Sequence, residues 1–127
     1  MRQLDVSRSG YNACLESLTR VKEILLFMQE HFQEDIVPET VAKHFNISTS
    51  HFMRIIKQHT GLTFTQYLNS YRLACSAKLL EDKSLTILEI SEQCGFTNIS
   101  YFNRLFKKKY ALSPSGYRKT IGKSDFQ

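Results

Sequence analysis

The sequence predicts an all-α protein of about seven helices, in which two similar halves are joined by one long, shared connector helix. Apolar residues recur at helical spacing through nearly all of the 127 residues. No stretch alternates apolar and polar residues for long enough to form a useful strand. The two halves also resemble each other residue by residue, which is typical of a chain built from a repeated unit.

The composition fits a globular protein and excludes several other classes. Hydrophobic residues make up 42% and charged residues 23%, with five glycines and two prolines, which excludes a disordered chain or a fibre. No run approaches the ~20 apolar residues that a membrane span requires, and the N-terminus lacks the apolar stretch of a signal peptide. We therefore expect a cytoplasmic protein that does not contact a membrane.

Helical spacing and capping residues predict three helices in the first half. The first spans 18–32, and its apolar face is expected to hold Leu18, Val21, Leu25, Met28 and Phe32. Pro38 suits the first turn of a short second helix, which Asn46 ends. Ser48 is placed to cap a third helix, and Gly61 is placed to end it.

The connector helix is predicted between the two halves. Thr63 and Gln66 have the spacing of a capping box, and the helix that they open extends to about Glu81. One face holds Phe64, Leu68, Tyr71 and Cys75, and the opposite face holds Leu73, Ala77 and Leu80. A helix that is apolar on two opposed faces is buried between two bodies, so we expect this helix to pack on both halves.

Three shorter helices complete the second half, each preceded by a residue that can cap its first turn. They are expected at 86–95, 97–109 and 114–121, opened by Thr86, Thr97 and Ser113. Glu89 forms a second capping box with Thr86. Pro114 suits the first turn of the last helix.

The internal repeat identifies the architecture of each half. Val41–Ser48 aligns with Ile90–Thr97 and, beyond one inserted residue, Phe52–Lys57 aligns with Phe102–Lys107. Each unit is a short helix, a tight turn, a hydroxyl cap and a second helix, which is helix-turn-helix architecture. Asn46 and Gly95 hold matching turn positions and are residue types that tolerate a left-handed backbone.

The second helix of each unit carries a polar face opposite an apolar face. These polar faces comprise Ser50, Met53, Arg54 and Lys57 in the first unit, and Ser100, Asn103, Arg104 and Lys107 in the second. A helix-turn-helix lays this helix in the major groove of DNA, where Arg suits guanine, Asn suits adenine and Met suits a thymine methyl. Any surface helix has a polar face, but the same Arg–Lys face repeated after a turn and a cap favours DNA reading.

The basic residues gather toward the C-terminus. Residues 1–92 hold ten basic against eleven acidic residues, whereas residues 93–124 hold seven basic residues and no acidic one. Such a block favours a polyanionic partner where the charges share a helix face. The residues expected to contact the DNA backbone are Thr49, Lys57, Thr97, Asn98, Lys107, Lys108 and Arg118.

Over roughly residues 20–120, the sequence resembles the DNA-binding domain of the AraC/XylS family of bacterial transcription regulators. The motifs that carry the resemblance are Phe64–Leu68, Ile87–Ser91, Cys94–Asn98, Tyr101–Lys107 and Ser113–Arg118. The resemblance implies seven helices in two helix-turn-helix lobes joined by a long helix. It also implies that the bases face Ser50, Met53, Arg54, Ile99, Ser100, Asn103 and Arg104. Among the departures from the family pattern, Ala111 stands where glycine often occurs.

These observations predict a sequence-specific transcription regulator that binds double-stranded DNA at promoter elements. A monomer with two reading helices would span two successive major-groove segments, roughly 34 Å apart, without needing a palindromic site. Regulation would follow from contact with RNA polymerase, as an activator, or from occlusion of the promoter. Such a protein would be associated with the nucleoid.

Two other classes of function fit the sequence less well. A helical protein-binding module could use the basic C-terminal face on an acidic partner, and binding without preference among DNA sequences would favour it. An enzyme is disfavoured, since the three cysteines show no pairing with histidine and neither catalytic residues nor a cofactor can be assigned. His44, His51 and His59 lack the spacing of a helical metal site, so no metal is expected. Three widely spaced cysteines also indicate no disulfide framework.

The predicted organisation places each element in a domain. We expect a linker or N-terminal extension at 1–17, a first lobe at 18–62, the connector at 63–82, a second lobe at 83–122 and a tail at 123–127. Asp5–Asn12 is interpreted as the linker itself, and Tyr11–Leu15 as the beginning of a helix that comes from a preceding domain. We interpret the chain as the C-terminal part of a larger regulator. Its DNA-binding domain is expected to be monomeric, and any dimerisation is expected to occur through an N-terminal domain outside this sequence.

Overall fold

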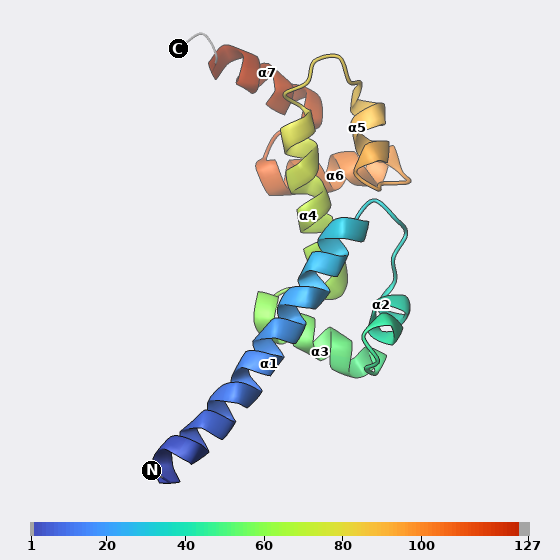
Figure 1. Cartoon of the computed structure of the whole chain (residues 1–127). Coiled ribbons are helices and arrows are strands. Elements are labelled where there is room, and N and C mark those ends of the chain that lie inside the picture. Colours follow the sequence, from blue (N-terminus) through green and yellow to red (C-terminus); the bar gives the residue numbers. More distant parts are fainter. Residues whose placement is uncertain (1, 125–127) are drawn as a thin grey trace. The chain divides into compact units, whose positions relative to one another are not determined.

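The computed structural model describes the backbone of residues 2–124 and the side chains of residues 16–121. Within these residues the chain forms seven helices and no strand, which confirms the predicted all-α fold (Figure 1). The chain divides into two compact units. The first comprises the residues up to His31 together with Ile36–Phe64, and the second comprises Phe32–Asp35 and the residues from Thr65 onward.

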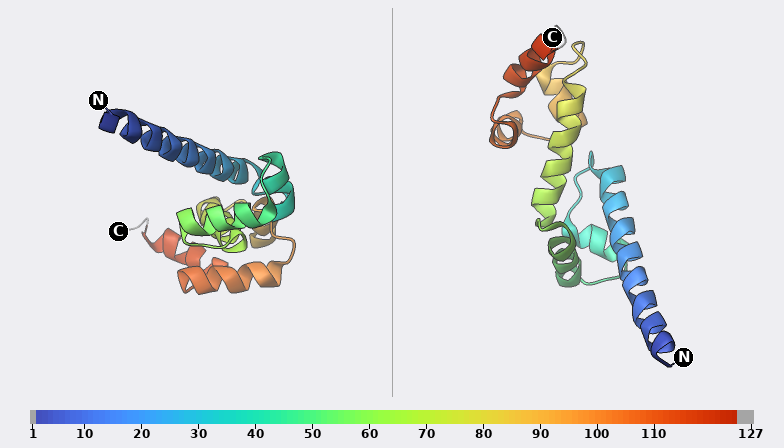
Figure 2. Two further views of the ribbon diagram at one scale, coloured as in Figure 1. Left: turned by 90° about the horizontal axis from the view of Figure 1, so that it is seen from below. Right: turned by 90° about the vertical axis from the view of Figure 1, so that its left-hand side faces the viewer.

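The first helix, α1 (Arg2–His31), begins much earlier than the sequence predicts. Asp5–Asn12, expected as a linker, is helical, and α1 is one unbroken ribbon in every view (Figures 1 and 2). No proline interrupts this segment, and its single Gly10 costs a helix only about 1 kcal/mol. Leu18, expected on the apolar face, is 51% exposed, whereas Ile24 is fully buried. The apolar face of α1 therefore starts one turn later than the residue spacing predicts.

The helix-turn-helix of the first unit consists of α2 (Pro38–His44) and α3 (Thr49–Thr60). Pro38 occupies the first turn of α2, as predicted. Asn46 adopts a left-handed φ of 56° in the turn that follows, which confirms that it ends the short helix.

Both ends of α3 are capped as the sequence predicts. The Ser48 hydroxyl accepts a hydrogen bond from the backbone N–H of His51 at 3.1 Å. At the other end, Gly61 has a φ of 76° and donates its N–H to the carbonyl of Lys57 at 2.9 Å. The two caps fix where the helix begins and ends, and thus which residues its first turn presents.

The buried hydrophobic side chains of the first unit come from α1, α2 and α3 and from Phe64, which follows α3 along the chain. They are Val21, Ile24, Met28, Val41, Ala42, Phe52, Ile55, Ile56 and Phe64. The rings of Phe52 and Phe64 meet edge to face with centroids 5.7 Å apart, a favourable aromatic geometry. Because the apolar face of α3 is buried in this way, its opposite face is left to solvent.

The remaining helices are α4 (Phe64–Leu79), α5 (Ile87–Gln93), α6 (Ile99–Tyr110) and α7 (Pro114–Ser124). The second helix-turn-helix is formed by α5 and α6. Thr86 accepts from the backbone N–H of Glu89 at 3.1 Å, and the Glu89 carboxylate accepts from that of Thr86 at 3.2 Å. This pair confirms the predicted capping box at the start of α5.

The N-cap of α6 is Asn98 and not Thr97, so the prediction at this position is wrong. The Asn98 side chain accepts a hydrogen bond from the backbone N–H three residues further on, at 3.0 Å. Ser48 and Asn98 each lie four residues before a buried phenylalanine, Phe52 or Phe102, so these two caps are the matching pair. The extra residue of the second unit is therefore in the turn, and it is the residue that the sequence alignment mistook for the cap.

The core of the second unit is rich in aromatic rings. Its buried members are Leu73, Ala77, Leu80, Ile90, Cys94, Phe96, Phe102 and Phe106. The Phe102 ring lies 5.0 Å from Phe96 and 5.8 Å from Phe106, measured between centroids, and Tyr117 of α7 packs edge to face on Phe106 at 5.4 Å. This cluster buries one face of α6 and leaves the other face exposed.

Arg72 of α4 binds two carbonyls that follow the end of α1. Its Nε donates to the Phe32 carbonyl at 2.7 Å and its Nη2 to the Glu34 carbonyl at 2.8 Å. Gly95, with a φ of 93°, lies against this pair, because a Cβ there would be 2.8 Å from the Phe32 oxygen and 2.9 Å from Arg72 Nε. Burial lowers the pKa of the Arg72 guanidinium, an effect that nearby Asp35 opposes. The turn before α6 thus depends on a glycine for both its backbone angle and its space.

Arg118 of α7 repeats this arrangement at the end of α4. Its Nε donates to the Leu80 carbonyl and its Nη2 to the Asp82 carbonyl, both at 3.1 Å. In both cases an arginine from a later helix binds the first and third carbonyls after the last residue of a helix, where the helix dipole favours a cation.

Candidate nucleic-acid interface

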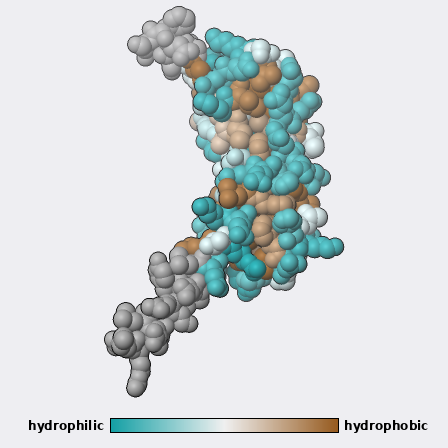
Figure 3. Space-filling view, in the orientation of Figure 1, coloured by the Kyte–Doolittle hydropathy of each residue, from teal (hydrophilic) through white to brown (hydrophobic). Residues whose placement is uncertain are grey.

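The surface is mostly hydrophilic, with hydrophobic side chains showing between polar ones in the view of Figure 3. None of the helices in the described residues is long and apolar enough to cross a membrane. A candidate binding surface therefore has to be located from the arrangement of particular residues, beginning with the two helices whose polar faces the sequence singled out.

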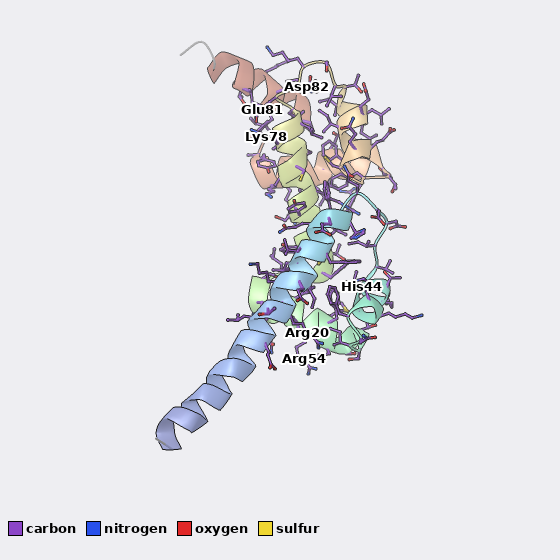
Figure 4. All side chains as sticks on the ribbon, in the orientation of Figure 1. Arg20, His44, Arg54, Lys78, Glu81 and Asp82 are labelled. Carbon is purple, nitrogen blue, oxygen red and sulfur yellow. The ribbon has the colours of Figure 1, made fainter. Side chains whose placement is uncertain are left out.

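The outer face of α3 presents the polar residues predicted for it. Ser50, Met53, Arg54 and Lys57 are all exposed. Met53 exposes 44% of its surface although it is apolar, and Arg54 extends outward from the helix (Figure 4). Phe52, Ile55 and Ile56 are buried on the opposite side. The structure therefore brings the predicted α3 residues together on one accessible face.

The outer face of α6 has the same layout. Ile99, Ser100, Asn103, Arg104 and Lys107 are all exposed. Phe102 and Phe106 are fully buried on the opposite side. Counted from the buried Phe52 and Phe102, arginine follows two residues later and lysine five residues later in both helices. The two units thus expose the same pattern of positive charge.

The first turns of both helices lack acidic residues. Thr49 opens α3 and is half-buried, Asn98 caps α6, and Thr97 is exposed in the turn before it. Free N–H groups and the positive end of the helix dipole make such a first turn attractive to a phosphate. These three residues are therefore placed where a DNA backbone could approach the helices.

The lysines at the ends of the two helices differ in their freedom. Lys57 is exposed and donates to the carbonyl of Gly61 at 3.2 Å, while Lys107 and Lys108 are exposed at the end of α6. Lys109 is held by Ser70, since its Nζ lies 3.1 Å from both the carbonyl and the hydroxyl of that residue. Burial also lowers the pKa of the Lys109 ammonium.

Arg118 differs from Lys107 and Lys108 in its hydrogen-bond partners. It was predicted to contact the DNA backbone, but two of its guanidinium nitrogens bind the carbonyls that follow α4. These two bonds anchor α7 to the end of α4, and contact of the remaining guanidinium N–H groups with the DNA backbone stays a prediction.

Arg104 has a neighbour that the sequence prediction missed. Its guanidinium carbon lies 5.4 Å from the ring centroid of Tyr101, one turn earlier on α6. The Tyr101 hydroxyl accepts a hydrogen bond from the Asn69 amide of α4 at 3.0 Å. An aromatic residue three positions before an arginine is visible in a sequence. No such signal marks Asn69, which is 32 residues away along the chain.

The histidines and cysteines are the remaining residues with metal-binding or nucleophilic side chains, and Cys14 lies outside the described side chains. Among the described side chains, no group of three or more His, Cys, Asp or Glu could hold a metal ion. The ring of His44 packs on those of Phe27 and Phe45, with centroids 4.4 and 4.9 Å away. Burial raises the pKa of the Cys94 thiol to about 12 and also raises that of Cys75. Burial thus favours the protonated form of both thiols near neutral pH.

An open groove of about 840 Å³ lies between α1 and α3 within the first unit. Its charged and titratable lining residues are Glu16, Arg20, Glu23, His51 and His59. Because acidic and basic groups are mixed along it, the groove does not select a ligand of one charge. The sequence prediction did not find this groove, since the placement of α1 beside α3 has no local signal.

Comparisons with known proteins identify relatives of the whole domain. Residues 41–120 match the family described as a helix-turn-helix domain. The HTH-type transcriptional activator RhaS of Salmonella schwarzengrund (strain CVM19633) is 35% identical over 99 residues, which cover 78% of this chain and 36% of that protein. The chain thus spans about a third of the length of the curated relatives that it matches.

Solved structures share the fold. The DNA-binding domain of AdpA, a global transcriptional factor solved in complex with a target DNA, superposes with a TM-score of 0.78 and is 26% identical, covering 84% of this chain and 96% of that one. A transcriptional regulator from Chromobacterium violaceum, with an AraC-type DNA-binding domain, has a TM-score of 0.75 and is 23% identical. That similarity covers 83% of this chain and 94% of the other.

Proposed function

The chain belongs to the AraC/XylS family of transcription regulators, and on that premise we propose that it binds double-stranded DNA with α3 and α6 in successive major-groove segments. The observation that carries the proposal is the duplicated face of α3 and α6. Each face is exposed, bears arginine and lysine at the same offsets, contains no acid and lies over a buried aromatic core. Exposure to solvent alone does not require arginine and lysine at the same positions in both units.

The residues divide into two roles. Those assigned to base edges are Ser50, Met53, Arg54, Ile99, Ser100, Asn103 and Arg104. Those assigned to the DNA backbone are Thr49, Lys57, Thr97, Asn98, Lys107, Lys108 and Arg118. Arginine can bind guanine through two parallel hydrogen bonds and asparagine can bind adenine in the same way, whereas lysine at a helix end reaches a phosphate.

The binding site that follows from this assignment is asymmetric. One chain carries two different reading helices, so a monomer reads two different short elements and no palindrome is required. Successive major-groove segments on one face of DNA lie roughly 34 Å apart, which places the two elements about one helical turn from each other.

Selection of binding sites from random duplex DNA tests the proposal directly. Two short, unlike elements separated by about one turn are the expected result. If no sequence is enriched while salt-dependent binding to an acidic protein persists, the chain is a protein-binding module and the proposal fails.

Two alanine variants test the division of roles. Arg104→Ala should weaken the free energy of binding to the selected duplex by about 1–3 kcal/mol and remove the preference for one base over the others at a single base pair. Lys107→Ala should weaken binding to all duplexes by the same factor and reduce the slope of log Kd against log salt concentration by about 1. Lys83→Ala is the matched control, because Lys83 is an exposed lysine of the same unit that lies outside both faces. Equal losses on selected and random DNA for both variants would contradict the assignment.

Regulation of transcription is the activity that we propose for the whole protein. The relative RhaS is named a transcriptional activator, which supports contact with RNA polymerase at a promoter on the chromosome. We assign DNA binding to a monomer and dimerisation to sequence outside this domain. Analytical ultracentrifugation of this chain with and without the selected duplex tests the first statement, and a 2:1 complex would refute it.

A further inference from the structure

We propose that Tyr101 is a specificity-positioning residue, which holds the Arg104 side chain in the orientation that reads one base pair. The inference rests on the proposed function, because it requires that Arg104 faces a base edge. It adds a residue to the reading surface that does not itself need to touch DNA.

The first step is the contact between the two side chains. Arg104 is exposed on α6, and its guanidinium carbon lies 5.4 Å from the centre of the Tyr101 ring, within the range of a cation–π interaction. The residues are three positions apart, so they share one side of the helix. A free arginine samples many rotamers, and this contact favours those in which the guanidinium stays over the ring.

The second step is that Tyr101 is itself fixed from outside its helix. Its hydroxyl accepts a hydrogen bond from the amide of Asn69 on α4, at 3.0 Å. Its half-buried ring also lies 6.4 Å, between centroids, from that of Phe96, which is buried in the core of the unit. The ring is therefore a platform anchored by two residues of the surrounding fold and not a second mobile side chain.

The first unit provides a comparison within the same molecule. Arg54 occupies the position of Arg104, but the residue three positions before it is His51, which is exposed. An exposed imidazole offers no tyrosine ring and no hydroxyl to anchor. We infer that α6 discriminates among bases at its arginine position more strictly than α3 does at the matching one.

The physical reason is preorganisation. An arginine already held near its bound geometry loses less conformational freedom on forming two hydrogen bonds with guanine. A loosely held arginine can instead turn toward another acceptor on a wrong base pair, which reduces the difference in affinity between right and wrong sequences. The platform should therefore act on specificity more than on general attraction to DNA.

The experiment uses the full chain and duplexes in which the base pair read by Arg104 is changed to each of the other three. That base pair is found first, as the position at which Arg104→Ala flattens the preference. Tyr101→Leu is then expected to lower the preference at the same base pair by about 2- to 5-fold. Affinity for random duplex should stay within about 1.5-fold of the wild type, since the net charge is unchanged.

Two further variants separate the platform from its anchor. Tyr101→Phe keeps the ring and loses the hydrogen bond to Asn69, and Asn69→Ala removes the same bond from the other side. Both should reduce the preference by less than Tyr101→Leu does, and by similar amounts. They also keep the inference testable if the leucine variant does not fold, as circular dichroism would reveal.

The double variant Tyr101→Leu with Arg104→Ala decides whether Tyr101 acts through the arginine. Preference in the double variant should equal that in Arg104→Ala alone. Tyr101→Leu could instead weaken binding to all duplexes by the same factor, both in the wild type and in the Arg104→Ala variant. That result would mean that Tyr101 only stabilises the fold, and the inference would be overturned.

The remaining outcomes distinguish the inference from the function on which it rests. If Arg104→Ala flattens one base pair while Tyr101→Leu leaves that preference intact, the inference fails and the proposed function stands. If Arg104→Ala changes the base preference at no position of the duplex, the assignment of Arg104 to a base edge fails, and the inference fails with it.

Discussion

The ends of α3 and α6 provide a pair of substitutions with opposite expected effects. Gly61 and Ala111 hold the same place after the two helices, with φ of 76° and 65°, and each donates its N–H to a lysine carbonyl four residues earlier, at 2.9 and 2.8 Å. One position is filled by glycine and the other by alanine. We expect Gly61→Ala to destabilise the protein and Ala111→Gly to stabilise it.

The magnitude follows from the backbone alone. An L-residue in the left-handed region costs about 1–2 kcal/mol, because Cβ crowds the following carbonyl. Glycine offsets about 0.4–1 kcal/mol of this through the greater freedom of its unfolded chain. A Cβ at Gly61 would meet nothing within 4 Å, so no clash and no packing gain alters the sum. Each substitution should therefore change the free energy of unfolding by about 0.5–1 kcal/mol, in opposite directions.

Urea unfolding followed by circular dichroism measures both changes. With a slope of about 1–3 kcal/mol per molar, the midpoint should move by about 0.5 M, downward for Gly61→Ala and upward for Ala111→Gly. The slope itself should not change, because neither residue alters the buried surface. The double variant should lie within about 0.5 kcal/mol of the sum of the two single effects.

The reasoning fails if Ala111→Gly lowers the midpoint. That result would mean that the methyl group of Ala111 stabilises the helix end by more than the left-handed angle costs. Midpoints that move in the same direction for both variants would likewise show that the two helix ends are not equivalent.

Three other predictions concern the second unit. Gly95→Ala should lower the free energy of unfolding by about 3 kcal/mol or more, a larger loss than that expected for Gly61→Ala. The reason is that a Cβ at position 95 would lie 2.8 Å from the Phe32 carbonyl oxygen. If Gly95→Ala and Gly61→Ala have similar urea midpoints, this steric contribution is excluded. Arg72→Met should lower the free energy of unfolding by about 2–4 kcal/mol, since two charged hydrogen bonds are lost. Arg72→Lys should not restore both bonds, because an ammonium cannot span two carbonyls. Thermal unfolding of the two variants measures both effects. Burial raises the pKa of the Cys94 thiol from an ordinary value of 9.0 to about 12, so this thiol should resist a thiol reagent at pH 8. As pH rises, the thiol ionises in the unfolded state before it ionises in the fold. The stability that the buried, protonated thiol provides is therefore complete below about pH 9 and is lost toward pH 12. Cys94→Ala should lose less stability than the wild type over that interval, and parallel pH profiles of the two proteins would contradict this.

Much of the fold could be read from local signals in the sequence. The caps at Ser48 and Thr86, the turn at Asn46 and the end at Gly61 depend on neighbours within four residues, and all were predicted. The polar faces of α3 and α6 were also predicted, because a 3.6-residue period separates buried from exposed positions without knowledge of the partner helices.

The features that the sequence did not predict depend on distant contacts or on a choice between equal local signals. Thr97 and Asn98 are both good caps, and only the helix geometry selects the second. Arg118 resembles a phosphate ligand in sequence, yet carbonyls 36 and 38 residues away bind it. Tyr101 was overlooked for the same reason, because its importance depends on Asn69, a residue of another helix.

The binding of Phe32 and Glu34 by Arg72 has a consequence for how the chain is made and cut. Phe32–Asp35 belongs to the second unit although residues of the first unit flank it on both sides, so the two units are interleaved along the chain. During synthesis at about 5–20 residues per second, these carbonyls leave the ribosome some 2–8 seconds before the arginine that binds them. A chain shortened to begin at Thr65 would leave Arg72 without either carbonyl. A protease that cleaves the short connection between α1 and α2 would, for the same reason, damage the unit that lies mainly after the cut.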